Sequence, residues 1–236
     1  NVSYLVASVL FIVGLKGLTH PRTAVRGNRM GALAMLIAVV VTLFDQQIVS
    51  FELVIIGLAI GAIIGAFLAI KVEMTSMPEL VAAFNGFGGA ASALVAGAAL
   101  VDGVSKNADA LSHQFTVSTV VSGLIGAVTF TGSFIAFAKL KGLISGNAIK
   151  FGGQNLLNGL IWLGSLGLCA YIVMEPGQLN SYWALLGVAG VLGILLTIPI
   201  GGADMPVVIA LLNSYSGLAA SATGFVLNNN VLIIAG

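Results

Sequence analysis

The chain has 236 residues, of which 58% are hydrophobic and only 7% charged, and its net charge at neutral pH is +1. A soluble domain carries about 25% charged residues, so this composition excludes a water-soluble globular protein. The near-neutral charge and the lack of any basic run give no indication of nucleic-acid binding. The expected fold class is all-α, a polytopic bundle of transmembrane helices.

Apolar runs of about 17–25 residues are long enough to cross a bilayer as helices. Eight complete runs are predicted as spans, at residues 2–19, 29–46, 51–72, 78–101, 116–140, 155–174, 181–200 and 205–227. A ninth apolar helix begins near Val231 and stops at Gly236. We therefore expect residues 1–236 to be one transmembrane domain of a longer protein, with a soluble domain after the ninth helix.

Basic residues are distributed unequally between the two sides of this predicted bundle. Eight of the nine lie on the side of the loops that follow spans one, three, five and seven: Lys16, Arg22, Arg26, Arg29, Lys71, Lys139, Lys141 and Lys150. Cytoplasmic loops of membrane proteins carry an excess of Lys and Arg. We expect these loops in the cytoplasm and the amino terminus outside. Because the chain starts directly with a membrane span, we expect a bacterial plasma (inner) membrane.

Two of the predicted spans begin with the same pattern. MPELVAAFNGFGGAA starts at Met77 and MPVVIALLNSYSGLAA starts at Met205, and each places an Asn seven residues after its Pro, at Asn85 and Asn213. The offset between the two segments is 128 residues. Two parallel halves of four spans each would explain it. Ser76 with Glu79 predicts a capping box, and Asp204 predicts a similar cap for the second segment.

Polar side chains inside the bundle are the candidate functional residues. At 1.5 Å per residue, both Asn side chains are expected roughly 10 Å into the membrane. An unpaired amide in hydrocarbon costs several kcal/mol, so both are predicted to face the bundle interior and to contact partners or water. Ser92 and Ser216 follow them on the same segments.

The span 116–140 adds polar and small residues at steps of four, four, three and four, which share one helical face. They are Ser118, Ser122, Gly126, Thr129 and Ser133. Such residues can serve only as hydrogen bonds between helices, worth about 0.6 kcal/mol each. They can also line a narrow hydrated path, and the pattern alone leaves both interpretations open.

The middle third of every predicted span lacks Asp, Glu, Lys, Arg and His. The chain therefore carries no obvious relay of ionisable groups through the membrane. Motifs of covalent, nucleotide-binding or metal catalysis, such as HExxH or a Walker loop, are also missing from the sequence. We expect no catalytic residue, bound cofactor or metal site within residues 1–236.

Three segments closely resemble the β-subunit membrane domain of the proton-translocating nicotinamide nucleotide transhydrogenase, and the resemblance covers essentially the whole chain. They are VEMTSMPELVAAFNGFGGAAS at 72–92, VTFTGSFIAFAKLKG at 128–142 and GADMPVVIALLNSYSGLAASATGF at 202–225. The resemblance implies an enzyme that moves hydride from NADH to NADP⁺, driven by inward proton flow. This chain would conduct the proton but not transfer the hydride.

The resemblance also implies the partners. NAD(H) would bind a soluble domain of the α subunit, and NADP(H) a soluble domain that continues from the ninth helix. The membrane part would pair with α-subunit helices, and the complex would be a dimer.

Residue by residue, the resemblance implies that Asp204 is the acidic residue at the cytoplasmic mouth, linked to the NADP(H) domain. Glu73 and Glu79 are candidate docking contacts on the same side. Some relatives carry a histidine where this chain has Gly88, so a proton relay centred on that histidine does not transfer. The pathway residues expected instead are Asn85, Ser92, Ser122, Thr129, Ser133, Asn213 and Ser216. Asn85 is expected to order water, and any ionisable relay to come from the partner subunit.

Two other functions fit the same pattern. A stand-alone secondary transporter with parallel repeats and a polar midplane site would look similar, but it would bind its solute within the bundle. A structural anchor would use the polar side chains only to hold helices together. For an anchor, mutation of Asn213 would lower stability without changing coupling.

Overall fold

The computed structural model describes residues 2–44 and 51–236 of the chain. Within these ranges the regular structure is entirely helical and strands do not occur, so the all-α prediction is confirmed. The chain divides into two compact units, residues 1–75 with Ala235 and residues 76–234 with Gly236. Each unit is described by itself.

The first unit contains α1 (Val2–Leu18), α2 (Pro21–Leu43) and α3 (Phe51–Lys71). The first two form a tight antiparallel hairpin because glycines face each other across it. A Cβ atom on Gly27 would lie only 2.6 Å from the carbonyl oxygen of Gly14 and 2.8 Å from the carbonyl carbon of Gly17. Small residues of this kind let membrane helices approach closely.

The second helix begins eight residues earlier than the predicted span 29–46, so the expected loop at 20–28 is wrong. Pro21 stands in the first turn, where its missing N–H costs nothing, and the Nδ1 atom of His20 accepts a hydrogen bond from the Arg22 backbone N–H at 3.2 Å. Arg22 and Arg26 are therefore helical residues. Residues 45 and 46 of the predicted span lie outside the described residues.

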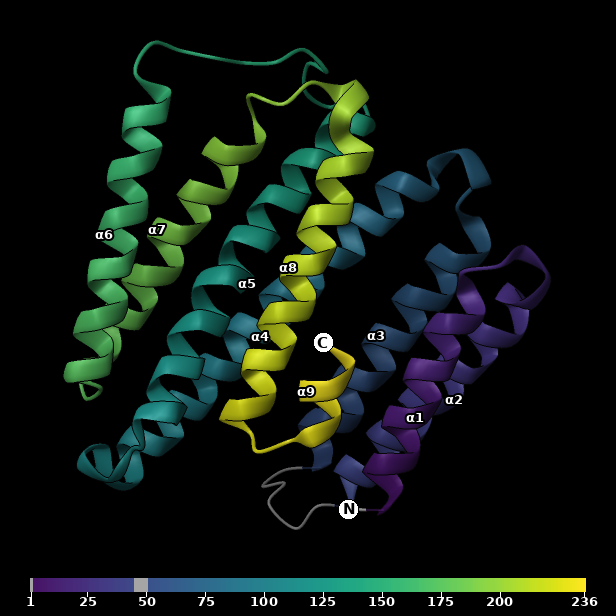
Figure 1. Cartoon of the computed structure of the whole chain (residues 1–236), viewed down its shortest axis with the longest axis horizontal. Helices are drawn as coiled ribbons and strands as arrows, with labels where there is room; N and C mark the ends of the chain where they lie inside the picture. Colours follow the sequence, from purple (N-terminus) through teal and green to yellow (C-terminus); the bar gives the residue numbers. More distant parts are fainter. Residues whose placement is uncertain (1, 45–50) are drawn as a thin grey trace. The chain divides into compact units, whose positions relative to one another are not determined.

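The second unit begins at Ser76 and holds the remaining long helices. Their order is α4 (Met77–Asn107), α5 (His113–Leu140), α6 (Gln154–Met174), α7 (Leu179–Thr197), α8 (Met205–Val226) and the short α9 (Asn230–Ala235), with 3₁₀ turns η2 (Ala108–Ala110) and η3 (Gly202–Asp204). The 3₁₀ turn η1 (Met74–Ser76) comes directly before α4. Helix α5 lies between α7 and α8 and packs against α4, while α6 covers the outer side of α7 (Figure 1). Half of the 28 residues of α5 are buried.

Seven helices of the described chain, α2 to α8, are long and apolar enough to span a membrane. The remaining predicted span, at residues 2–19, corresponds to α1, an apolar helix of 17 residues. Helix α4 has 31 residues and is longer than the predicted 78–101. Its last turns include an ion pair between Lys106 and Asp102, 2.8 Å apart and one helical turn from each other.

A tyrosine fastens α7 to the two helices beside it. The hydroxyl of Tyr182 donates to the carbonyl oxygen of Ala93 at 2.7 Å, and the residue is only 1% exposed. Two glycines make room for its ring, since a Cβ atom on Gly97 or on Gly123 would lie 2.7 Å from Tyr182 atoms. The space left by these two glycines therefore determines how α7 packs against α4 and α5.

The two Met-Pro helices begin alike, but not with the predicted side-chain caps. Each follows a 3₁₀ turn and has Pro in its first turn. Neither Ser76 nor Asp204 makes a side-chain capping bond, so the predicted capping box is wrong. The backbone of both residues is near φ −92°, ψ 0° rather than extended, and an N-cap side chain normally needs the extended conformation to reach the helix N–H groups.

The predicted division into two four-helix halves stays a prediction. The boundary between the compact units falls after α3, not after α4. The twin 3₁₀ turns before α4 and α8 add a local likeness to the sequence match.

Candidate functional site

Buried polar side chains of α4, α5 and α8 meet along the middle of the second unit. Five of the predicted pathway residues are buried there: Asn85, Ser92, Ser122, Thr129 and Ser133. The span 116–140 was expected to present its polar stripe to neighbouring helices, and Ser122, Thr129 and Ser133 do lie on its buried face. Ser118 at the start of that stripe is only half-buried.

Two glycines bring the α4 and α5 backbones almost into contact at this place. A Cβ atom on Gly89 would lie 2.7 Å from the carbonyl oxygen of Gly126 and 3.0 Å from the Cβ atom of Thr129. Side chains one turn away on each helix must therefore point into the same narrow interface. Asn85 is one turn from Gly89, and Ser133 is one turn from Thr129.

Asn85 and Ser133 form the first layer of this interface together with Thr129. The Asn85 amide nitrogen donates to the Ser133 hydroxyl oxygen at 2.9 Å. The Asn85 Oδ1 atom and the Thr129 Oγ1 atom are buried and have no hydrogen-bond partner in the described chain. Buried polar atoms nearly always have partners, in the protein or in ordered water. This layer thus offers unused hydrogen-bonding capacity inside the membrane domain.

Ser122, Thr223 and the backbone of Ser92 form a second layer, and its hydrogen bonds are complete. The Ser122 and Thr223 hydroxyl oxygens are 2.7 Å apart. Ser122 lies within 3.2 Å of the carbonyl oxygens of Ser92 and Ala219, and Thr223 donates to Ala219 at 2.9 Å. The Ser92 hydroxyl donates to the Gly88 carbonyl at 3.1 Å. This layer holds three helices together.

Replacement of Ser122 by alanine is expected to lower the free energy of unfolding by about 0.6–1.7 kcal/mol, the range measured for hydrogen bonds between membrane helices. The Thr223 hydroxyl would lose its closest side-chain partner. Thermal unfolding of the purified protein in detergent measures the change. The matched variant Ser118→Ala removes a half-buried hydroxyl of the same helix and should change stability by less than about 0.5 kcal/mol. Equal effects for both variants would contradict the role of the second layer.

Thr223 was missed by the sequence analysis. Its signal was the spacing of four from Ala219, which places it on the small-residue face of α8 but gives no indication of its partners on other helices. The hydrogen bond to Ser122 joins residues 101 positions apart in sequence. Periodicity within one helix cannot reveal such a pair.

The prediction that Asn213 faces the interior is wrong for this chain taken by itself. Its side chain is exposed, whereas its neighbour Leu212 is buried. The buried face of α8 runs through Val208, Leu212 and Ala219, and a step of one residue turns a side chain by about 100°. Ser216 is half-buried, and its hydroxyl would lie 3.0 Å from a Cβ atom on Gly88.

The predicted coupling residues lie outside the buried interface. Asp204 is exposed at the end of η3 and Glu79 is half-buried in the first turn of α4. Glu73 is exposed in the first unit. In the described part of the chain the one ion pair joins Lys106 and Asp102. None of the three carboxylates named here is therefore paired with a basic side chain in those residues.

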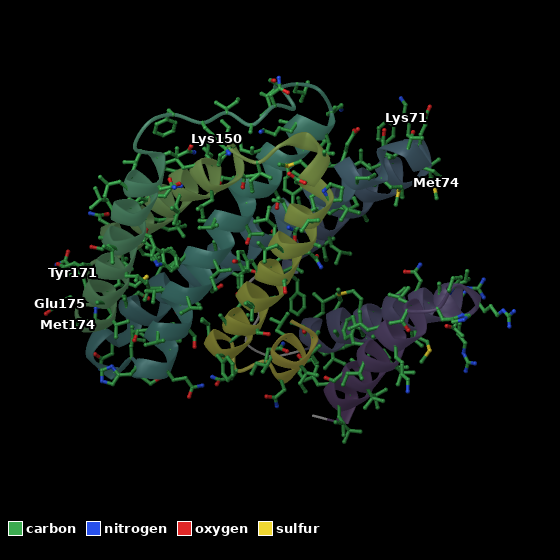
Figure 2. All side chains as sticks on the ribbon, turned by 45° about the horizontal axis from the view of Figure 1, so that its top comes forward. Lys71, Met74, Lys150, Tyr171, Met174 and Glu175 are labelled. Atoms are coloured by element: carbon green, nitrogen blue, oxygen red, sulfur yellow. The ribbon has the colours of Figure 1, made fainter. Side chains whose placement is uncertain are left out.

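The ends of the second unit differ in charge. Lys150 lies in the loop before α6, and Glu175 lies directly after the other end of that helix (Figure 2). The turn η3, with Asp204, is on the Lys150 side, because the Gly202 backbone N–H donates to the Gly146 carbonyl of the same loop at 2.7 Å. Asp204 therefore shares its end of the bundle with Lys139, Lys141 and Lys150.

Two buried polar residues at this end were also missed. Lys139 is only 4% exposed and Gln154 only 6% exposed. Both hydrogen-bond to backbone carbonyls at the end of α7. The sequence analysis counted Lys139 only as a sign of orientation.

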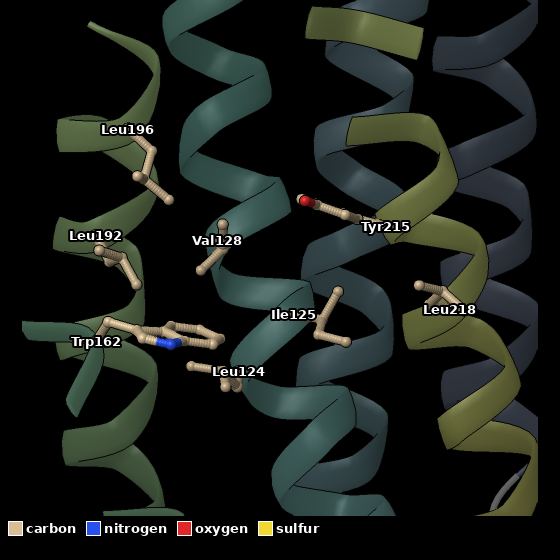
Figure 3. A pocket seen from close by; sticks show the side chains of 8 residues that line it. All are labelled: Leu124, Ile125, Val128, Trp162, Leu192, Leu196, Tyr215 and Leu218. Carbon is tan, nitrogen blue, oxygen red and sulfur yellow. The ribbon is translucent and has the colours of Figure 1, made fainter. Parts of the chain in front are cut away.

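A cleft of about 370 Å³ lies between α5, α6, α7 and α8 (Figure 3). Its lining is apolar except for the ring edges of Trp162 and Tyr215; the other residues are Leu124, Ile125, Val128, Leu192, Leu196 and Leu218. A site for a polar solute needs several converging polar groups. This cleft does not provide them.

The fold and the buried polar interface define a polytopic α-helical membrane domain with hydrogen-bonding groups in its interior. The family model described as NAD(P) transhydrogenase beta subunit matches residues 1–236, and the chain belongs to this family. It is 46% identical over 238 aligned residues to the NAD(P) transhydrogenase subunit beta of Rhodospirillum rubrum. The identity to the protein of the same name from the strain ATCC 11170 of this species is also 46%. In both comparisons the alignment covers 99% of this chain and 51% of the relative, so the chain spans about half the length of these relatives.

Proposed function

We propose that this chain is the proton-conducting membrane domain of a NAD(P) transhydrogenase. Inward proton flow through it would drive hydride transfer from NADH to NADP⁺ on soluble domains. Family membership over the whole chain supports this function. The relatives are about twice as long, which supports a further soluble domain, and we assign NADP(H) binding to that domain. The α subunit would supply additional helices and the NAD(H) site, and the complex would be a dimer in a bacterial inner membrane.

The observation that carries the proposal is the pair of unpartnered atoms in the first layer. The Asn85 Oδ1 atom and the Thr129 Oγ1 atom are both buried, and the Ser133 hydroxyl accepts from Asn85 beside them. A buried water needs two to four polar partners, and these three side chains supply them. Water held there can pass a proton along its hydrogen bonds, whereas Asn cannot carry a net proton itself. Ordering water is the role we assign to Asn85, Thr129 and Ser133.

The path would reach the cytoplasm at the end that carries Asp204. An exposed carboxylate can exchange protons with water and with a docked domain, so Asp204 would be the link to the NADP(H) domain, with Glu73 and Glu79 as further docking contacts. The basic residues at that end agree with the positive-inside rule, which supports an amino terminus outside. The exposed Asn213 and the half-buried Ser216 would line the path only where α-subunit helices cover α8.

A stand-alone transporter is less well supported. The cleft between α5 and α8 is apolar, and the polar layers between α4 and α5 are packed closely around glycines. Such close packing does not suit a solute site.

The test uses the full complex in proteoliposomes with a pH-sensitive dye. Asn85→Leu should reduce proton movement during hydride transfer by about tenfold or more, since loss of about 1.4 kcal/mol of stabilisation along the path already gives a factor of ten. Hydride exchange confined to the soluble domains should continue. Asn155→Leu, at an exposed position of α6, is the matched control and should behave as wild type.

Unchanged proton movement in Asn85→Leu would place the path elsewhere and leave Asn85 as a packing residue. Loss of hydride exchange together with proton movement would indicate general damage instead. Thermal unfolding of each variant separates these outcomes.

A further inference from the structure

The carboxyl end of α7 poses a hydrogen-bonding problem. An α-helix leaves its last four carbonyl oxygens without partners inside the helix. At the end of α7, backbone N–H groups satisfy two of them, from Ile198 to Ile194 at 2.9 Å and from Ile200 to Thr197 at 3.1 Å. The carbonyls of Leu195, Ile198 and Ile200 face neighbouring elements.

Lys139, near the end of α5, satisfies two of these carbonyls. Its Nζ atom donates to the Ile198 oxygen at 2.7 Å and to the Ile200 oxygen at 2.6 Å, and a third bond goes to the Asn147 oxygen at 3.0 Å. An ammonium group has three N–H donors and no acceptor, so all its donors are used. A positive charge at a helix carboxyl end is also favoured by the helix dipole.

Gln154, the first residue of α6, satisfies the carbonyl of Leu195 with a bond of 3.1 Å from its amide nitrogen. The loop between α5 and α6 is therefore fastened to α7 at both of its ends. Two backbone bonds add to this, from Ile149 to Ile198 at 3.3 Å and from Gly202 to Gly146 at 2.7 Å. The last of these reaches the turn η3.

Lys139 and Gln154 differ in the position of the carbonyl oxygens to which they donate hydrogen bonds. Gln154 binds within α7, whereas Lys139 binds Ile200, four residues before Asp204. Lys139 is also six residues after Ser133 on the same continuous helix. Lys139 thus connects the helix that carries the polar face to the segment just before the turn with Asp204.

We propose that Lys139 is a positioning residue that holds η3, and with it Asp204, in register with the polar interface of α5. The proposal rests on the proposed function, because it concerns the link between the proton path and the soluble domain. A buried charge held only by carbonyl oxygens is costly. An apolar side chain would suffice if the site needed only packing.

The test compares Lys139→Met with Gln154→Leu in the full complex in proteoliposomes. Each variant removes side-chain donors to the end of α7, so both should lower the thermal unfolding temperature. Only Lys139→Met should also lower the number of protons moved per hydride, with the coupled rate falling by about tenfold (about 1.4 kcal/mol). Lys139→Arg, which keeps the charge, should restore a large part of the coupled rate.

Three outcomes decide the matter. If Lys139→Met and Gln154→Leu lose stability but both keep the wild-type number of protons per hydride, Lys139 is a structural cap and the proposal is overturned. If Lys139→Met does not assemble, Lys139→Gln, which keeps two N–H donors, takes its place with the same expectation of reduced coupling. If wild type itself moves no protons during hydride transfer, the proposed function fails, and the positioning role fails with it.

Discussion

Valine in place of Gly126 is expected to lower the free energy of unfolding by about 3 kcal/mol, the upper part of the usual range for overpacking a tight interface. The first atom of any side chain at this position would lie 2.5 Å from the Gly89 carbonyl oxygen and 3.1 Å from the Ala93 Cβ atom. A backbone oxygen cannot turn aside as a flexible side chain can, so α4 and α5 would have to separate. Thermal unfolding in detergent and the yield of assembled complex measure the effect.

The matched control for this variant is Gly164→Val in α6. A Cβ atom on Gly164 would meet no other atom within 4 Å, and the residue is exposed. This variant should unfold within about 0.5 kcal/mol of wild type. A similar loss of stability in both variants would mean that the close contact between α4 and α5 is not what makes Gly126 necessary.

Thr129→Val is expected to reduce coupled proton movement by about tenfold while changing the free energy of unfolding by less than about 1 kcal/mol. Valine has nearly the same shape as threonine, so packing is retained, but the Oγ1 atom that we assign to water binding is lost. Proton movement in proteoliposomes and thermal unfolding are measured on the same preparation.

The sign of the stability change distinguishes a hydrated layer from a dry one. In a dry layer the Thr129 hydroxyl is an unpaired buried polar group, and its removal should stabilise the protein by about 1–3 kcal/mol. A clear gain in stability with unchanged proton movement would therefore contradict the proposed water site. The control is Thr131→Val, because the Thr131 hydroxyl already donates to the Gly190 carbonyl at 2.7 Å. That variant should lose about 1 kcal/mol of stability and keep its coupling.

The helices were predictable from the sequence because hydrocarbon requires long apolar segments with internal hydrogen bonds. Errors occurred where the chain leaves that environment. The start of α2 was placed eight residues late because Arg22, Arg26 and Arg29 reduce hydropathy without opposing helix formation. Ser76 and Asp204 were expected to cap helices, but the preceding 3₁₀ turns hold their backbone in another conformation.

The candidate site was predictable only in part. The sequence predicted an interior-facing Asn85 and a polar face on α5 that includes Ser133, but it did not pair these two residues, which the structure joins by a hydrogen bond. The same Met-Pro…Asn motif gave a wrong prediction for Asn213. Two helices with the same sequence motif need not have the same face covered by neighbouring helices. Lys139 was treated as a marker of orientation because its carbonyl partners belong to loop and helix-end backbone, which carries no side-chain signal.

The second polar layer has a further consequence for a membrane that stores a proton gradient. A continuous chain of water molecules through the domain would let protons leak across the membrane and dissipate that gradient, whether or not hydride was transferred. Ser122, Thr223 and the Ser92 carbonyl use their hydrogen bonds on one another, so they leave little capacity for passing water. If protons cross along α4 and α5, this layer blocks the path at rest. Its hydrogen bonds must then break briefly in each turnover to let a proton pass. Proton conduction would then depend on movement of α8. This helix carries Thr223 of the second layer, and Asp204 lies just before its first turn.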